Sequence, residues 1–474
     1  MTETETMTEY DVIIIGGGAV AENVADRAVQ GGLTAVLIES ELVGGECSYW
    51  ACMPAKALLR SGHALRAAQR VKGASAAVTG ALDVAAVFAR RNEFVHEWDD
   101  ASQVSWVHDT GIGLLRGHGR ITGEKRVSVT AADGTVTDLT ARHAVVVSAG
   151  SDPLIPSIPG LDTVTPWTPR DATSAKAAPT SLAIIGGGVV AVEMATAYAT
   201  FGTTVTIIAR SGILRGQEDF AGELVSQGLR DLGVTIVKAE PERVERTEDG
   251  VSILVAGDAI LADHVLIATG RAPRSTDLGL ETIGLTPGDW LTVDDTLLVD
   301  GFDWLYATGD VNHRALLTHQ GKYQARACGD VIAVRAKGGT VDDAPWGTHV
   351  ATADHTAVPQ VTFSDPEVAS VGMTSEEAAK AGLDIRVVDY DMSWVAGVSL
   401  QADGYTGTAR MVVDESRKVI VGVTFVGQDV AELIHAATIA IVAEVPIDRL
   451  WHAVPAYPTM NETWLRLLEA YGRP

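Results

Sequence analysis

Residues 11 to 39 read DVIIIGGGAVAENVADRAVQGGLTAVLIE, and this stretch decides the fold. Its first five residues form an apolar run of the kind found in a central parallel strand. The glycine turn GGGAVA (16–21), a helical stretch and a second apolar strand (34–38) come next, and the second strand ends at Glu39. Such a turn admits a pyrophosphate to the start of the helix, and an acid about twenty residues later binds ribose hydroxyls. The stretch therefore predicts a dinucleotide-binding βαβ unit with nucleotide contacts from Gly16, Gly18, Ala21 and Glu39.

The same pattern recurs between residues 181 and 208. A strand (181–185) enters the turn GGGVVA (186–191), a helix comes next, and the second strand (204–208) ends at Arg210. No acid stands at the place of the ribose-binding carboxylate, and Arg215 lies a few residues further on. Two arginines there suit the 2′-phosphate of NADP, so NADPH is predicted to be preferred over NADH; the alternative is that both arginines are merely solvated. The predicted contacts of this unit are Gly186, Gly188, Arg210, Arg215 and Gly270.

Two cysteines lie between these units, in the stretch GGECSYWACMPAK at 44–56. Closing a loop as short as that between Cys47 and Cys52 gains little entropy, so the pair suggests a disulfide made and broken in turnover. Five residues of helix rise about 7.5 Å, which exceeds the Cα separation of a disulfide. If the pair bonds, the backbone must be bent or only entering a helix, and a helix start would lower a cysteine pKa. The alternative is two unrelated buried cysteines.

Composition limits the classes of protein to which the chain can belong. Its 474 residues predict two to four domains. The net charge of −25 argues against nucleic acid as a partner. Three cysteines are too few for a secreted disulfide framework, which favours a cytoplasmic protein. The apolar runs are too short to span a membrane. Residues 1–10 lack the basic region of a signal peptide, so this segment is predicted to be a disordered leader.

The remaining segments have a regular order. Residues 57–110 have helical spacing and residues 115–147 alternate as strands do, and prolines between 153 and 160 suggest a domain crossover. Residues 334–358 lack periodicity and predict an exposed excursion. An α+β domain is predicted from residue 359 onward, with strands at 361–363, 384–388, 409–413 and 419–425. Cys328 fits no motif and is predicted to be a core thiol.

Seven motifs occur in a characteristic order. They are GGGAVA with Glu39, GGECSYWACMPAK, GGGVVAVE, IATGRAP, YATGD, FSDPEVASVG and YPTMNE. With this set, the chain from about residue 9 to 470 resembles the flavin-dependent pyridine nucleotide-disulfide oxidoreductases, which include glutathione reductase, dihydrolipoamide dehydrogenase and mercuric reductase.

The resemblance implies an α/β fold with two Rossmann-like domains and a C-terminal α+β dimerisation domain. The implied segments are an FAD-binding domain in two parts (1–155 and 276–350), an NAD(P)-binding domain (156–275) and an interface domain (351–474). It also implies a homodimer, with Cys52 facing the flavin and Cys47 exchanging with substrate. Lys56 would pair with Glu193 near the flavin's reactive edge. Further implied cofactor contacts are Gly45, Lys56, Gly150 and Asp310, the last at the FAD ribitol.

The chain departs from the family pattern near the reacting sulfurs. The family places a proton-shuttling histidine before Pro-Thr, whereas Tyr457 stands there and Glu462 remains. Mercuric reductases resemble the chain in carrying this tyrosine, but the cysteine pair that they bring near the C-terminus has no counterpart in YGRP. Between the cysteines, Ser48 to Ala51 are bulkier than usual, and Val189 replaces an aromatic lid.

The leading hypothesis is therefore an NADPH-dependent FAD oxidoreductase. Electrons would pass from NADPH through FAD to Cys47 and Cys52 and on to a small thiol or disulfide substrate, or in the reverse direction. The predicted catalytic residues are Cys47, Cys52, Lys56, Glu193, Tyr457 and Glu462, and no metal site is predicted. The alternatives are a flavin reductase of quinones or metal ions, and a complex subunit similar to dihydrolipoamide dehydrogenase. The sequence leaves the substrate, the direction and the route of protons open.

Overall fold

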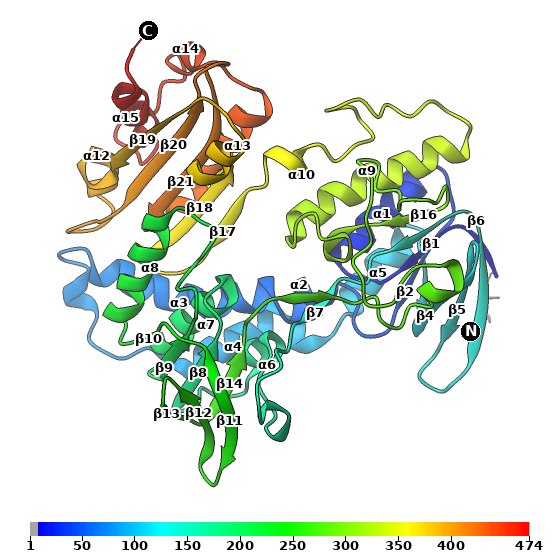
Figure 1. Cartoon of the computed structure of the whole chain (residues 1–474), viewed down its shortest axis with the longest axis horizontal. Helices are drawn as coiled ribbons and strands as arrows, with labels where there is room; N and C mark the ends of the chain where they lie inside the picture. The colour runs from blue at the N-terminus through cyan, green and yellow to red at the C-terminus, as the bar shows by residue number, and fades with distance from the viewer. Residues whose placement is uncertain (1–7, 474) are drawn as a thin grey trace. The chain divides into compact units, whose positions relative to one another are not determined.

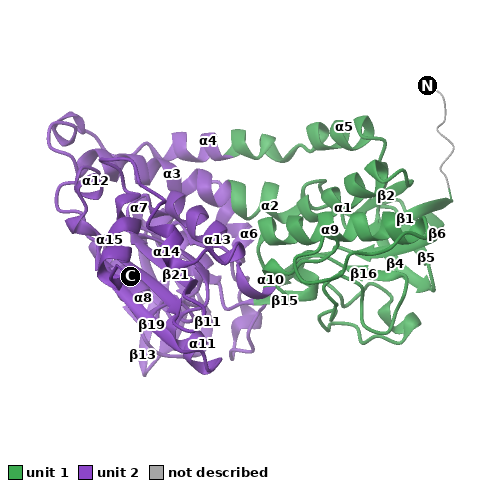
Figure 2. Ribbon diagram, turned by 90° about the horizontal axis from the view of Figure 1, so that it is seen from above, with its two compact units in different colours: residues 1–53, 92–152, 271–354 green, residues 54–91, 153–270, 355–474 purple. Residues whose placement is uncertain are grey.

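The computed structural model describes residues 8–473, so most of the predicted leader lies outside the described residues. The chain divides into two compact units, shown in different colours in Figure 2. Unit 1 comprises residues 1–53, 92–152 and 271–354, and unit 2 comprises residues 54–91, 153–270 and 355–474. Within residues 8–473, no helix combines the length and the apolar character that crossing a membrane requires.

Unit 1 is built on a sheet of order β3-β2-β1-β6-β5-β4, with β16 added beside β6 (Figure 1). Parallel pairing joins β1 (Glu9–Ile15) to β2 (Ala35–Glu39) and to β6 (Val136–Val147), because these apolar strands are buried on both faces. The other members are β3 (Gly113–Arg116), β4 (His118–Gly123), β5 (Arg126–Thr130) and β16 (Leu305–Ala307). The first predicted βαβ unit and the strands predicted at 115–147 are confirmed.

Two helices of unit 1 pack side by side against this sheet. They are α1 (Ala19–Gln30) and α9 (Thr318–Ala336), and small residues allow their close approach. A Cβ at Gly329 would lie 2.6 Å from Cβ of Arg27. Cys328 is fully buried in the core that these helices share with β1 and β6, as predicted.

The helical region predicted at 57–110 is interrupted. Its helices are α3 (Cys52–Gln69), α4 (Val84–Phe94) and α5 (Ala101–Asp109), with turns between them. The preceding short helix is α2 (Gly45–Tyr49). The region is therefore helical as predicted, but it consists of separate helices and not of one continuous helical stretch.

Unit 2 contains the second predicted βαβ unit. Its parallel sheet has the order β10-β9-β8-β14, and α7 (Val189–Thr200) connects β8 (Ser181–Ile185) to β9 (Thr204–Ile208). The remaining strands of this sheet are β10 (Thr235–Val237) and β14 (His264–Ile267). An antiparallel sheet is made of β11 (Pro241–Thr247), β12 (Gly250–Val255) and β13 (Asp258–Ala262).

The C-terminal part of unit 2 is an antiparallel sheet of order β17-β18-β21-β20-β19. Four strands agree with the prediction: β17 (Gln360–Thr362), β19 (Ile385–Asp391), β20 (Thr408–Asp414) and β21 (Val419–Gly427). The sequence analysis missed β18 (Glu367–Gly372), whose small residues lack a strong strand pattern but pair with β21. The main helices beside this sheet are α13 (Ile434–Val442) and α15 (Glu462–Tyr471).

The excursion predicted at 334–358 is wrong at both ends. Helix α9 continues to Ala336, and α10 (Ala353–Thr356) carries a buried carboxylate. That carboxylate, Asp354, accepts hydrogen bonds from the amides of Gln320 and Gln324 at 2.8 and 2.9 Å. Long-range hydrogen bonds therefore hold the end of a segment whose local pattern has no period.

Candidate active site

The glycine turn of unit 1 has the space that a bound pyrophosphate requires. Gly18 is the N-cap of α1, and a Cβ there would meet nothing within 4 Å. Gly16 has φ +112°, and a Cβ there would lie 2.4 Å from the carbonyl oxygen of Ser148, so only glycine is accommodated. Ala21 is fully buried against the sheet. The turn thus leaves the N-terminus of α1 open to an anion.

Glu39 borders this candidate nucleotide site from the end of β2. It is only 9 % exposed. Its carboxylate accepts the backbone N–H groups of Gly17 and Glu41, both at 2.7 Å. Burial raises the pKa of Glu39, while these two N–H groups act in the opposite direction. A cavity of about 230 Å³ adjoins it, lined in part by Gly16, Glu39, His118 and Arg274. These residues fit the nucleotide half of FAD.

Gly150 and Asp310 come after neighbouring strands of the same sheet. Val147 of β6 pairs with Ala307 of β16, so the segments after both strands emerge at one edge. Asp310 accepts a hydrogen bond from the hydroxyl of Ser151, whose oxygen in turn accepts one from Nε of Arg271 at 2.8 Å. The sequence analysis missed Ser151 and Arg271, although both flank predicted motifs. The arrangement holds the Asp310 carboxylate in a fixed orientation.

The two cysteines lie on either side of a break between helices. Helix α2 ends at Tyr49, Trp50 has φ −136°, and α3 begins at Cys52. This confirms that the backbone is bent between the cysteines and that Cys52 stands at a helix start. Gly45 allows the bend to pack against the turn, because a Cβ there would lie 2.9 Å from Cα of Gly18.

The sulfur atoms share a set of polar contacts within unit 1. A hydrogen bond with Cys52 and burial raise the pKa of Cys47. Sγ of Cys52 lies 3.3 Å from Oγ1 of Thr318, at the start of α9. Thr318 was missed by the sequence analysis, because it lies 266 residues from Cys52. The geometry brings the pair close enough to interact, as a redox-active pair requires.

The bulky residues between the cysteines have a structural explanation. Tyr49 is fully buried, and its carbonyl oxygen accepts a hydrogen bond from Nε1 of Trp98 at 3.2 Å. The Tyr49 and Trp50 rings contact each other at a centroid distance of 5.7 Å. These contacts fix the segment that spaces the two sulfurs.

In unit 2, Lys56 and Glu193 form the ion pair implied by the resemblance. Nζ of Lys56 lies 2.8 and 3.0 Å from the two carboxylate oxygens of Glu193, which is 3 % exposed. The backbone N–H of Phe363 donates to the same carboxylate at 3.0 Å, and Lys56 lies 4.8 Å from the centre of the Phe363 ring. Phe363 begins the FSDPEVASVG motif, whose contribution here was not foreseen. A buried carboxylate is thus matched by a cation and a backbone donor.

The second glycine turn repeats the geometry of the first. Gly188 is the N-cap of α7, and a Cβ there would also meet nothing within 4 Å. Gly186 has φ +130°, Gly270 has φ +145°, and Ala191 is fully buried. This turn also leaves the start of its helix open to a pyrophosphate.

The two predicted phosphate-binding arginines lie in the loop after β9. The side chain of Arg210 is 74 % exposed, and Nη1 lies 2.9 Å from Oε1 of Glu240. Nη1 of Arg215 donates to the hydroxyl of Ser211 at 3.3 Å. The sequence analysis missed Glu240, because that acid approaches from 30 residues further along the chain. An ion pair this exposed contributes little to stability, so Arg210 remains available to a ligand.

The structure gives Tyr457 and Glu462 different environments. Tyr457 is 77 % exposed, whereas Glu462 is 4 % exposed. The Glu462 carboxylate accepts the backbone N–H of Gly397 at 3.3 Å. Both residues belong to unit 2, whereas Cys47 and Cys52 belong to unit 1. The predicted roles of Tyr457 and Glu462 in the cysteine chemistry therefore stay predictions.

Comparison with known proteins shows the family. Residues 10–325 match the sequence profile described as pyridine nucleotide-disulphide oxidoreductase, and residues 358–468 match the dimerisation domain of the same family. A dihydrolipoyl dehydrogenase from Geobacillus stearothermophilus is 30% identical, over 98% of this chain and 97% of its own. A mercuric reductase from Shigella flexneri is also 30% identical, over 95% of this chain and 79% of its own.

Solved structures agree on the fold. The HOCl-induced flavoprotein disulfide reductase RclA from Escherichia coli has a TM-score of 0.81 at 25% identity, covering 97% of this chain and 99% of its own. LpdA from Mycobacterium tuberculosis has a TM-score of 0.83 at 22% identity, covering 98% of this chain and 100% of its own. The predicted fold class is therefore confirmed, with a C-terminal dimerisation domain. The family depends on FAD, uses NAD(P) and acts on sulfur groups. The two glycine turns, the cysteine pair and these matches together show that the chain belongs to the pyridine nucleotide-disulphide oxidoreductase family of flavoenzymes.

Proposed function

We propose that the protein is an NADPH-dependent disulfide reductase, or the reverse dithiol oxidase, that acts on a small thiol compound. The observation that carries this proposal is the position of Cys47 and Cys52 on either side of a helix break, with their side chains hydrogen-bonded. A continuous helix would keep them too far apart for a disulfide. In this proposal Cys47 exchanges with substrate and Cys52 lies nearest the flavin.

The residues that would hold FAD belong to the first glycine turn and its surroundings. They are Gly16, Gly18, Ala21, Glu39, Gly45, Gly150 and Asp310. Bound FAD would supply electron transfer between the nicotinamide and the disulfide. Glu193 would orient the Lys56 side chain, since the carboxylate contacts Nζ through both oxygens.

Absorption spectra of cysteine variants test the assignment. The purified protein should be yellow, and adding two electrons should produce a long-wavelength band from the thiolate beside the flavin. Cys47→Ser should show that band without reduction, and Cys52→Ser should abolish it. The reverse pattern would exchange the two roles, and no band in any of the proteins would contradict the proposal.

Cofactor preference and cellular location belong to the same proposal. Arg210 and Arg215 lie in the loop after β9, and two arginines in this loop would suit a 2′-phosphate, which supports NADPH over NADH. A cytoplasmic location suits a cysteine pair that cycles between thiols and disulfide, because the cytosol supplies reductant. We also retain the four-segment domain assignment made from the sequence.

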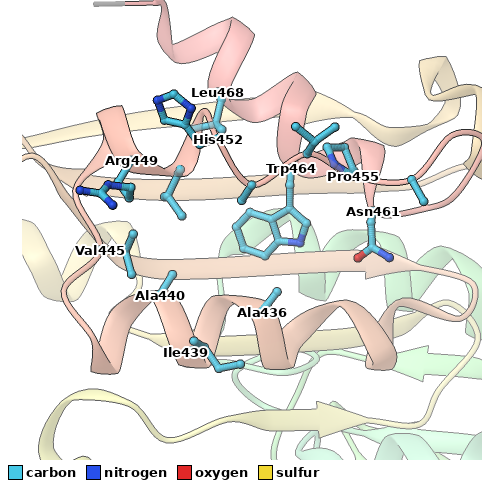
Figure 3. Close-up of a pocket in the computed structure, with 14 residues that line it drawn as sticks. Ala436, Ile439, Ala440, Val445, Arg449, His452, Pro455, Asn461, Trp464 and Leu468 are labelled. Atoms are coloured by element: carbon cyan, nitrogen blue, oxygen red, sulfur yellow. The ribbon is translucent and has the colours of Figure 1, made fainter.

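The proposed assembly is a homodimer. An apolar pocket of about 710 Å³ lies in the C-terminal part of unit 2, where Figure 3 shows Trp464 above the helix that carries Ala436 and Ile439. Ile439 is exposed although it is apolar, and the pocket lies within the segment that matches the family's dimerisation domain. A second copy of the chain would cover such a surface. Sedimentation should show a dimer that Ile439→Asp weakens, and a monomeric wild type would contradict the assembly.

A second candidate is direct reduction of metal ions or quinones. It is favoured by Tyr457, because a phenol, unlike the imidazole of histidine, does not readily exchange protons with a thiol at neutral pH, and by relatives named mercuric reductase. A third candidate, a subunit of a larger complex, is suggested by the relative named dihydrolipoyl dehydrogenase. Turnover of simple disulfides, quinones and metal ions by wild type and Cys47→Ser distinguishes these candidates, because direct reduction would survive loss of Cys47.

A further inference from the structure

The loop that carries the two proposed phosphate-binding arginines is anchored at two points. This arginine loop covers residues 209–218, between β9 and the next helix. Next to the second glycine turn, the backbone N–H of Leu214 donates to the carbonyl oxygen of Gly187 at 2.8 Å. The other anchor is Glu218, the last residue before the helix. Arg215 therefore lies between two fixed points.

Glu218 is held by residues of the C-terminal part of unit 2. Its side chain is 5 % exposed. The carboxylate accepts hydrogen bonds from the backbone N–H and the hydroxyl of Ser375, at 2.7 and 2.8 Å, and from Nη1 of Arg410 at 2.8 Å. Ser375 begins α11 (Ser375–Lys380), and Arg410 lies on β20. A buried carboxylate is costly unless donors match it, so these contacts fix the position of Glu218.

Arg410 is itself oriented by a second carboxylate and by an aromatic ring. Its Nε and Nη2 atoms each lie 2.7 Å from an oxygen of Asp389, on the neighbouring strand β19. This two-pronged pairing aligns the planar guanidinium and leaves Nη1 for Glu218. The guanidinium carbon also lies 5.1 Å from the centre of the Phe220 ring, in the first turn of α8 (Asp219–Asp231). Arg410 thus links the C-terminal sheet to the end of the arginine loop.

Helix α8 packs closely against the same sheet further along its length. A Cβ at Gly228 would lie 2.1 Å from the carbonyl oxygen of Asp365 and 2.7 Å from Cδ of Pro366, just before β18. Figure 1 shows α8 next to β18. Contact this close leaves the helix little freedom to shift. The start of α8, and with it the end of the arginine loop, is therefore fixed relative to the C-terminal sheet.

We propose that Arg410 is a positioning residue for nucleotide selection, because through Glu218 it holds the loop in which Arg210 and Arg215 would meet the 2′-phosphate. This inference rests on the proposed NADPH preference and deepens it. It assigns part of the selectivity to a residue of the C-terminal sheet, 200 positions along the chain from Arg210.

The loop benefits from an anchor because glycines make it pliable. Gly212 has φ +85° and Gly216 has φ +99°. Glycine reaches many backbone conformations, so a loop with two of them loses more entropy when it is ordered. Binding of a 2′-phosphate would otherwise include this loss, together with the ordering of two arginine side chains. A loop that is already anchored binds the phosphate more tightly.

The test isolates the contribution of the 2′-phosphate. Flavin-loaded, oxidised protein is titrated calorimetrically with NADP⁺ and with NAD⁺, which differ only in that phosphate. Wild type should bind NADP⁺ more tightly. Arg410→Gln should lower the affinity for NADP⁺ roughly 10-fold, the loss expected when two side chains must be ordered on binding, and leave the affinity for NAD⁺ unchanged. Arg410→Lys, which keeps the charge, should recover part of the affinity.

Arg417→Gln is the matched control. Like Arg410, Arg417 pairs with one buried and one exposed carboxylate, those of Asp414 and Glu444, at 2.8 and 2.7 Å. Neither of these acids belongs to the arginine loop, so both affinities should stay at the wild-type value. A purely structural role of Arg410 would lower the thermal stability of Arg410→Gln and preserve the ratio of the two affinities, and that result would overturn the inference.

A second variant keeps the inference testable if Arg410→Gln does not fold. Asp389 is half exposed and contacts Arg410. Asp389→Asn should therefore weaken NADP⁺ by about 2- to 5-fold, the range for an exposed ion pair, and leave NAD⁺ unchanged. Unaltered NADP⁺ affinity in this variant would also overturn the inference. Failure of the proposed NADPH preference is distinguishable, because wild type would then bind both nucleotides equally and Arg210→Ala would change neither affinity.

Discussion

The two glycine turns of the chain share their backbone geometry. The two βαβ units that contain them differ in the residue found at or just after the end of the second strand. Gly18 and Gly188 each cap a helix facing open space, and Ala21 and Ala191 are equally buried. The first unit ends its second strand with Glu39, a buried carboxylate bonded to the turn itself. The second unit instead has an exposed arginine in contact with an acid from a distant strand end. In the proposed function the turn provides the pyrophosphate site, and the residue at the end of the second strand selects the nucleotide.

The largest expected effect comes from a substitution in the first βαβ unit. Glu39→Ala leaves the buried N–H of Gly17 without its acceptor and removes the proposed ribose contact. Each unsatisfied buried group costs about 1–3 kcal/mol, so flavin affinity should fall by at least about 10²-fold. The flavin-to-protein ratio after gel filtration measures this, with Arg210→Ala as the matched control in the second unit. Stoichiometric flavin in Glu39→Ala would show that the carboxylate does not hold the nucleotide.

The next largest effect is expected from a substitution in the second βαβ unit. Arg210→Glu places a carboxylate beside Glu240 and at the proposed position of the 2′-phosphate, so NADPH should bind about 10- to 10²-fold more weakly, the range expected for loss of one charge-assisted hydrogen bond. NADH should be affected much less. Steady-state flavin reduction with both nucleotides is the measurement, and Glu240→Gln, which frees Arg210, should not weaken NADPH. Equal use of NADH by wild type would show that the arginines are solvated surface residues.

The smallest effect concerns the middle glycine of each turn. A Cβ at Gly187 would lie 2.2 Å from the carbonyl oxygen of Gly212, whereas a Cβ at Gly17 would lie 2.8 Å from the Cβ of Glu39. A backbone carbonyl moves aside less easily than a side chain does. Gly187→Ala should therefore destabilise the apoprotein by about 1–3 kcal/mol, and Gly17→Ala should destabilise it by less. Denaturant unfolding of the apoproteins would compare them. The opposite order would mean that the loop containing Gly212 adapts readily.

Much of the fold could be predicted because its signals are local. Apolar runs of about five residues, glycines at positive φ and an acid or arginine after a strand all act over a few residues. Both βαβ units, the bend between Cys47 and Cys52 and the buried Cys328 are consequences of such signals. Strand β18 was missed because its small residues form a strand only when β21 pairs with them.

By itself, the sequence determined the family, the two nucleotide turns and the position of the cysteine pair, since these depend on residue type and spacing. Only the tertiary structure decided which distant side chains complete each site. Thr318 reaches Cys52 across 266 residues, and Glu193 reaches Lys56 across 137. Glu22 reads in the sequence as an ordinary acid in the first turn of a helix, where the helix dipole favours it. In the structure its Oε1 atom is buried where α9 packs against α1, and no local pattern encodes that packing.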